Sequence, residues 1–219
     1  MAASGSQLET EFLEQSAEIR ETDVCVGGSC QNLLQKPGMS SHGKTLARKT
    51  KFRLRFPASA IEKWAGGFSD ASESVIEKIA RVARRQGYLT REQFLAIAEW
   101  KTARSRPRCE KNDAGFVKEV TRAALGSKDE RFKIQALRLL DGVEWPTASV
   151  ILHFCDRGRY PIVDVRARWS AGLDATPSYS LPFWIEYTDF MRALAAGAGV
   201  SMRTLDKALW QYSKVKQGS

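Results

Sequence analysis

The chain has 219 residues, of which 43% are hydrophobic and 27% charged, a balance typical of a globular protein rather than a disordered or membrane-embedded one. No run of about 18 apolar residues is present, so the sequence predicts no membrane partner. Four scattered cysteines and two histidines argue against a zinc or iron–sulfur site and predict a reduced, cytoplasmic protein.

The positive charge of the chain lies behind an acidic N-terminal segment. The formal net charge is +9, yet residues 1–40 hold six acidic and only two basic side chains. Residues 41–60 then hold six basic side chains and no acidic one, among them Lys49, Lys51 and Arg53. Positive charge on this scale attracts polyanions such as DNA, although a solvated basic surface explains the same pattern.

The N-terminal part of the sequence divides into a leader and the start of a domain. Residues 1–45 are rich in glycine and serine and are predicted to form a flexible acidic leader, with the folded domain spanning 46–219. Basic and apolar residues alternate from Lys51 to Phe56, before Pro57. This pattern predicts either a short strand or an extended segment laid over the core.

Capping signals and apolar periodicity predict helices throughout the rest of the chain, so the expected fold class is all-α. Two capping boxes are indicated, Thr90 with Gln93 and Ser127 with Glu130. No nucleotide-binding loop is present, so no nucleotide cofactor is expected. The other helices are predicted to run from Ser69 or Asp70 to about Arg85, Asp113 to Gly126, Pro146 to Phe154, Asp164 to Leu173, Ser180 to Ala196 and Ser201 to Tyr212.

The segment 139–172 contains a tight connection between two predicted helices. The connection reads Asp141-Gly142-Val143-Glu144. Gly142 permits a positive φ, and Val143 is expected to be an apolar plug between the helices.

This segment resembles the helix-hairpin-helix superfamily of DNA glycosylases. Val163-Asp164 falls on the family's aspartate motif at the expected distance from the hairpin. The segment is also similar to a group of small bacterial proteins with a Pro-x-Ala-Ser-x-Ile-Leu helix and a Tyr-Pro-x-x-Asp-x-Arg-Ala segment. The residues that match the hairpin pattern are Leu140, Gly142, Val143, Thr147 and Ala148.

The resemblance implies a glycosylase-like helical bundle that binds double-stranded DNA and hydrolyses the N-glycosidic bond of a damaged or modified base, as in DNA repair. Asp164 would be the catalytic carboxylate. Hairpin amides would hold a DNA phosphate, and hairpin carbonyls a monovalent cation, with no other cofactor. The family's Schiff-base lysine corresponds to Pro146, so the resemblance implies a monofunctional, water-using reaction.

The expected DNA contacts come from the hairpin, the segment after Asp164 and the basic stretch near the start of the domain. Trp145, Tyr160 and Trp169 are candidates to line or wedge a base pocket. The predicted DNA-binding residues are Gly142, Val143, Glu144, Trp145, Thr147, Ala148, Arg166, Arg168, Lys49, Lys51 and Arg53.

The sequence also supports plainer alternatives. Glu144 replaces the second hairpin glycine and Asp141 the usual proline, which places two negative charges beside the expected phosphate. The chain would then be a non-catalytic DNA-binding module, or a regulatory protein whose hairpin contacts a protein partner. Asp164 would serve only as a helix N-cap. His153 and Cys155 are expected to be core residues.

Overall fold

The computed structural model describes residues 52–69, 71, 73–156, 160–173 and 179–218. All described residues belong to one compact unit, Ala47–Ser219. The predicted leader, together with Lys49 and Lys51, lies outside the described residues. Within the described part the chain is helical and contains no strand, which confirms the predicted all-α class. No helix in this part is both long and apolar enough to cross a membrane.

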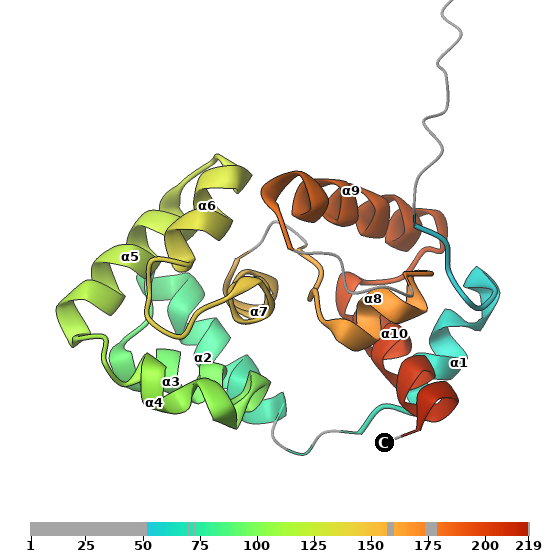
Figure 1. Ribbon diagram of the computed structural model, residues 1–219, viewed down its shortest axis with the longest axis horizontal. Coiled ribbons are helices and arrows are strands. Elements are labelled where there is room, and N and C mark those ends of the chain that lie inside the picture. The colour runs from blue at the N-terminus through green and yellow to red at the C-terminus, as the bar shows by residue number, and fades with distance from the viewer. Residues whose placement is uncertain (1–51, 70, 72, 157–159, 174–178, 219) are drawn as a thin grey trace, which may run out of the picture. The chain divides into compact units, whose positions relative to one another are not determined.

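The described residues form ten α-helices and two short 3₁₀-helices (Figure 1). In chain order these are η1 (Ala58–Ala60), α1 (Ile61–Gly66), α2 (Glu73–Gln86), α3 (Arg91–Lys101), η2 (Ala103–Ser105), α4 (Arg106–Cys109), α5 (Ala114–Gly126), α6 (Glu130–Leu137), α7 (Trp145–Cys155), α8 (Val165–Ser170), α9 (Leu181–Gly197) and α10 (Met202–Gln217).

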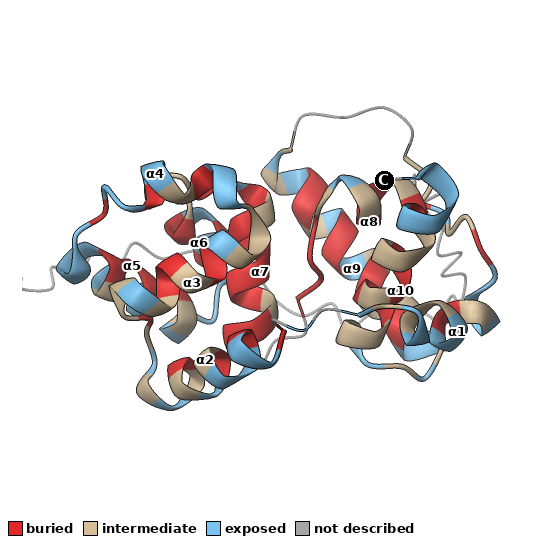
Figure 2. Ribbon diagram, turned by 90° about the horizontal axis from the view of Figure 1, so that it is seen from below, coloured by how far each residue is buried: buried red, intermediate tan, exposed pale blue. Residues whose placement is uncertain are grey.

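Helix α7 is the most completely buried element of the described unit. Helices α2, α3 and α6 all pack against it (Figure 1). Only Pro146 and His153 among its residues are partly exposed, and Figure 2 shows the rest of the helix as buried. A second set of contacts joins α10 to α1, α8 and α9. Because α7 is apolar on all sides, other helices must cover it.

The alternating segment before Pro57 is an extended segment over the core rather than a strand. The amides of Arg53 and Arg55 donate to the carbonyls of Ala171 (2.9 Å) and Ser170 (3.0 Å) at the end of α8. Phe52 and Phe56 are buried, whereas Arg53 is exposed. The alternation of buried and exposed side chains is therefore real. The backbone of the segment, however, hydrogen-bonds to the end of a helix instead of to a second strand.

Most predicted helix starts are confirmed by their side-chain caps. The Thr90–Gln93 capping box is present, and Asp113, Ser180 and Ser201 cap α5, α9 and α10.

The predicted capping box at Ser127 is wrong. Asp129 caps α6 instead, by accepting from the amides of Arg131 (2.8 Å) and Phe132 (3.1 Å). Helix α6 ends at Leu137, and Leu139 is left 65% exposed.

The hairpin connection between α6 and α7 has the predicted backbone geometry. Gly142 has a φ of +81°, and Val143 is buried. The side chain of Asn112, which precedes α5, holds the turn in place. It accepts a hydrogen bond from the amide of Asp141 (2.8 Å) and donates to the carbonyl of the same residue (3.0 Å). It also donates to the carbonyl of Cys109 (2.8 Å). A Cβ at position 142 would lie only 2.7 Å from the Cys109 Sγ and 2.9 Å from its backbone nitrogen.

We expect Gly142→Ala to lower the free energy of unfolding by about 2 kcal/mol or more, because it combines an unfavourable φ with a backbone clash. Gly87→Ala is the matched control, since Gly87 has a φ of +80° and a Cβ there would meet no other side chain or backbone atom within 4 Å. Denaturant unfolding of both variants measures the difference. Equal losses in the two variants would contradict the close packing of the hairpin against Cys109.

Candidate functional site

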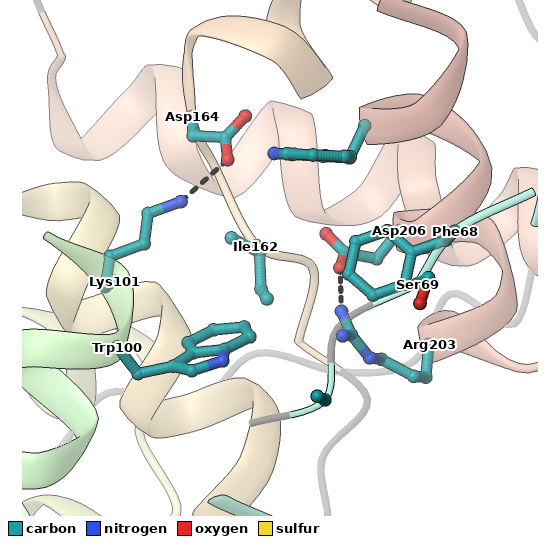
Figure 3. A pocket seen from close by; sticks show the side chains of 10 residues that line it. Phe68, Ser69, Trp100, Lys101, Ile162, Asp164, Arg203 and Asp206 are labelled. Carbon is teal, nitrogen blue, oxygen red and sulfur yellow. Dashed lines mark hydrogen bonds and ion pairs between the residues drawn. The ribbon is translucent and has the colours of Figure 1, made fainter. Parts of the chain in front are cut away.

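A cavity of about 450 Å³ opens among the loop after α1, the end of α3, the segment before α8 and one face of α10. Figure 3 shows Trp100 and Lys101 entering it from one side, and Phe68, Arg203 and Asp206 from the other. The described residues that line it are Phe68, Ser69, Ala71, Trp100, Lys101, Ile162, Asp164, Arg203, Asp206 and Trp210. It therefore combines two carboxylates, two cations and three large aromatic rings.

Asp164 is held in the wall of this cavity by the hydrogen bonds of its own segment. The amide of Val163 donates to the Ser149 hydroxyl (3.0 Å) on α7, and the Tyr187 hydroxyl on α9 donates to the carbonyl of Ile162 (3.2 Å). The Oδ1 of Asp164 accepts from the amide of Ala167 (2.8 Å), which caps α8. The predicted N-cap is thus confirmed, and the same side chain also lines the cavity.

Lys101 forms an ion pair with the other oxygen of Asp164. The distance from Lys101 Nζ to Asp164 Oδ2 is 2.6 Å, and each side chain is only 14% exposed. Burial alone would raise the pKa of Asp164, but the positive charge of Lys101 and hydrogen bonds from Ala167 and Lys101 outweigh it and lower the pKa. Asp164 is therefore held as an anion at neutral pH.

Asp206 has the opposite electrostatic character. It is 6% exposed and forms an ion pair with Arg203. Arg203 also donates to Glu73 (2.9 Å), which pairs with Lys207 (3.0 Å). Burial is the largest cause that raises the pKa of Asp206, to about 7; the negative charge of Asp164 adds to it, while Arg203 and Lys101 oppose it.

The aromatic walls of the cavity are formed by Phe68, Trp100 and Trp210. The rings of Phe68 and Trp210 lie edge to face at 5.3 Å, and the Arg203 guanidinium lies 5.2 Å from the Phe68 ring and 5.9 Å from that of Trp100. Trp100 also packs against Phe154 at 5.5 Å. Flat rings beside fixed charges suit a planar, polar ligand.

The aromatic residues that the sequence offered for a base pocket lie elsewhere. Trp145 is buried beneath the Arg138 guanidinium (4.4 Å). Tyr160 is buried against Trp184 (5.8 Å), and Trp169 stacks on Tyr212 (5.7 Å). None of these three residues lines the cavity beside Asp164.

The hairpin offers fewer free backbone groups than the resemblance implies. The amide of Val143 donates to the Leu140 carbonyl (3.0 Å), and the amide of Ala148 donates to the Glu144 carbonyl (2.9 Å). Thr147 is buried. The phosphate contacts predicted for the Val143 and Ala148 amides therefore require groups that already have backbone partners.

Two hairpin carbonyls near the expected monovalent cation each accept one hydrogen bond and keep a second lone pair. The carbonyl of Leu140 accepts from Val143, and that of Asp141 accepts from the Asn112 side chain. Both carbonyls are thus already engaged in hydrogen bonds. Among the described residues, no group of three or more His, Cys, Asp or Glu side chains is arranged to hold a metal ion.

The predicted DNA-binding charges are scattered. Glu144 is exposed and lies 3.7 Å from Arg138. The Arg166 guanidinium covers the Trp210 ring at 5.3 Å, next to the cavity. Arg168 is only 2% exposed and packs over Tyr179 and Phe183, so in this conformation it is unable to reach a DNA phosphate.

Arg53 lies in a separate open groove. Its neighbours there are Trp169, Tyr212 and Lys216. This groove shares no residue with the cavity beside Asp164.

The remaining predicted core residues behave as expected. His153 Nδ1 lies 2.7 Å from the Tyr160 carbonyl, and burial lowers the pKa of His153 to about 4. Cys155 is buried, which raises the pKa of its thiol to about 12. Neither side chain is therefore charged at neutral pH.

Sequence reasoning missed three functional candidates, Lys101, Asp206 and Asn112. Lys101 stands 63 residues from Asp164, and no local sequence pattern connects the two. Asp206 lies on α10 at a position that the helical period places on the buried face. An acidic residue at such a position is the one sequence signal that could have identified it.

No family model matches the chain, and no curated protein or solved structure matches it either.

We expect Asp164→Asn and Lys101→Met each to destabilise the protein by about 3 kcal/mol at neutral pH, since each leaves a buried partner charge unpaired. Asparagine retains the helix cap. The double variant should lose clearly less than the sum of the two single losses. Denaturant unfolding of the four proteins measures this coupling, and strict additivity would contradict a direct ion pair.

The loss caused by Asp164→Asn should also depend on pH. The pKa of Asp164 is lower in the folded protein than in the unfolded chain, where it is about 3.9. The charge of Asp164 therefore stabilises the fold above about pH 4 and contributes less as the pH falls below that value. Unfolding measured from pH 7 to pH 3 should show the variant and the wild type converging.

Proposed function

We propose that this protein binds double-stranded DNA and accepts an extrahelical base in the cavity beside Asp164, where it hydrolyses the N-glycosidic bond as a monofunctional DNA glycosylase. The observation that carries the proposal is the position of Asp164. The residue that matches the family's aspartate motif lies, as an anion, in the wall of an aromatic-lined cavity.

The geometry fits the charge that develops during glycosidic hydrolysis. As the base departs, the sugar acquires oxocarbenium character, and a preorganised carboxylate stabilises that positive charge. Lys101 and the Ala167 amide fix the Asp164 carboxylate in one orientation. Trp100, Phe68 and Trp210 give the cavity an aromatic lining, which suits a flipped base.

The same contacts favour water over an amine as the nucleophile. Lys101 is the cation nearest to Asp164 among the residues that line the cavity, and its ammonium group is paired with that carboxylate. A protonated amine has no free electron pair with which to attack the sugar. The proposed reaction therefore leaves an intact abasic site.

Backbone phosphates have a suitable place beside the cavity. A neighbouring concavity of about 320 Å³ shares Arg203 with it and adds Arg81 and Arg84. Arginine side chains bind phosphate well because their donors form a planar fork. Arg84 already donates to the Phe154 carbonyl and Arg203 to Glu73. Glu77 lines the same concavity, so Arg81 is the arginine there that best supports phosphate binding.

A second candidate function is recognition of a protein partner by the hairpin. Leu139 is 65% exposed, and Asp141 and Glu144 are exposed beside it. An apolar side chain flanked by two acidic residues suits a basic, partly apolar protein surface better than DNA.

An analogue of the transition state tests the proposal without knowledge of the base. A duplex with a pyrrolidine abasic nucleotide carries a positive charge in the sugar ring, and a duplex with tetrahydrofuran there is neutral. We expect the wild type to bind the charged duplex about tenfold more tightly or better, equivalent to about 1.4 kcal/mol. Asp164→Asn should remove this preference, and fluorescence anisotropy measures both affinities.

Equal affinities of the wild type for the two duplexes would contradict the role of Asp164. Weak, salt-insensitive binding of both would favour the protein-partner candidate, because phosphate contacts give a steep salt dependence.

Single-turnover cleavage of a panel of duplexes identifies the base. The duplexes contain uracil, hypoxanthine, alkylated purines, 8-oxoguanine or mismatches. Strand breaks should require hot alkali, disappear in Asp164→Asn, and leave no borohydride-trapped adduct. A trapped adduct would contradict the monofunctional reaction.

A further inference from the structure

The cavity contains two carboxyl groups in opposite environments. Asp164 has a full ion pair with Lys101 at 2.6 Å and a backbone donor at 2.8 Å. Asp206 lines the same cavity from α10, one turn beyond Arg203. Figure 3 shows the two carboxyl groups on different sides of the cavity, each beside its own cation. A pair of carboxyl groups whose environments differ in this way is a common basis for dividing acid and base roles.

The cation beside Asp206 is shared with another carboxylate, whereas the cation beside Asp164 has no second acidic partner among the described contacts. Arg203 binds both Asp206 and Glu73. Lys207 binds Glu73 as well. The positive charge available to Asp206 is thus partly neutralised by Glu73. Asp206 is also the more deeply buried of the two, with a side-chain exposure of 7% against 14% for Asp164.

The charged and titratable groups around Asp206 come from every helix that meets the cavity. Arg203 belongs to α10, Lys101 to α3, Asp164 to the start of α8 and Tyr187 to α9. Burial and the charge of Asp164 favour the protonated form of Asp206, and Arg203 and Lys101 favour the anion. The balance raises the pKa of Asp206 to about 7, so both forms are populated near neutral pH.

We propose that Asp206 is the proton donor of the site, which protonates the departing base while Asp164 stabilises the sugar cation. This inference rests on the proposed function and adds a requirement on the substrate. The preferred bases are neutral ones that leave poorly as anions and need a proton, rather than bases that already carry a positive charge.

The proposed step is balanced in atoms and charge. The bond between C1′ and the base nitrogen breaks, and its electron pair stays with the base. The proton of Asp206 is transferred to the base. Water adds its oxygen to C1′, and its released proton goes to the Asp164 carboxylate and then to solvent, from which Asp206 is reprotonated. One water is consumed, and the products are the free base and an abasic sugar.

The first test reads the proton on Asp206 without any substrate. Carbon NMR of protein labelled at the aspartate carboxyl carbons follows each titration, and Asp206→Asn identifies the signal of Asp206. We expect one carboxyl group to titrate near pH 7 in the wild type and to be absent from the variant. If every aspartate titrates below about pH 5, as an unperturbed carboxyl group would, Asp206 holds no proton at neutral pH and the inference is overturned.

The second test compares leaving groups. With a neutral base that the wild type releases, Asp206→Asn should lower the single-turnover rate by about 100-fold or more. With 7-methylguanine, which already carries a positive charge and needs no proton, the same variant should lose less than about tenfold. Asp189→Asn, an exposed residue of α9, is the matched control and should retain the wild-type rates.

The outcomes separate this inference from the proposed function. Equal losses for neutral and charged bases would overturn the role of Asp206 and leave that of Asp164 intact. No cleavage of any duplex by the wild type would overturn the proposed function and the proton-donor role together. Circular dichroism of Asp206→Asn checks that its rate loss does not come from unfolding.

Discussion

The ion pair between Lys101 and Asp164 determines the character of the whole cavity. It joins the last residue of α3 to the cap of α8 across 2.6 Å, in surroundings where each side chain is 14% exposed. Burial by itself would favour a neutral carboxyl group at Asp164. Lys101 reverses that preference, and the resulting negative charge in turn favours the protonated form of Asp206. The ion pair thus sets the protonation of Asp164, whereas burial is the largest cause that raises the pKa of Asp206, and Lys101 itself opposes that rise.

The ion pair depends on the burial of α7. This helix presents Ser149 to the segment before Asp164 and Phe154 to Trp100, so it contacts both sides of the cavity wall. Its apolar surface is covered on several sides, which leaves little freedom for α3 to move relative to it. The hairpin before α7 is also constrained, because Asn112 hydrogen-bonds its turn and Cys109 leaves no room for a Cβ at Gly142.

Local features of the fold were predictable from the sequence, because their causes lie within a few residues. The Thr90–Gln93 box and the caps at Asp113 and Asp164 each involve a side chain and an amide three residues away. Ser127 failed as a cap because Asp129, two residues later, competes for the same role.

In the candidate site, too, features with local causes were predictable and features that depend on long-range packing were not. Asp164 was found through a short motif, whereas Lys101 and Asp206 join it only through tertiary packing between segments far apart in the chain. Trp100 and Trp210 have ordinary helical spacing, and nothing in that pattern distinguishes a ring that faces a cavity from a ring that faces the core. The proposed glycosylase activity therefore rests on the motif and the cavity together.

The acidic hairpin and the arginine-lined concavity together change where DNA binding is expected. Asp141 and Glu144 repel a phosphate, and the amides of Val143 and Ala148 already donate within the backbone. Arg81, Arg84 and Arg203 lie instead beside the cavity that holds Asp164. A phosphate bound there would be close to the sugar whose base enters the cavity, so anchoring and chemistry would share Arg203. The hairpin would then serve mainly to support α7, and its exposed acidic surface would be free for another partner.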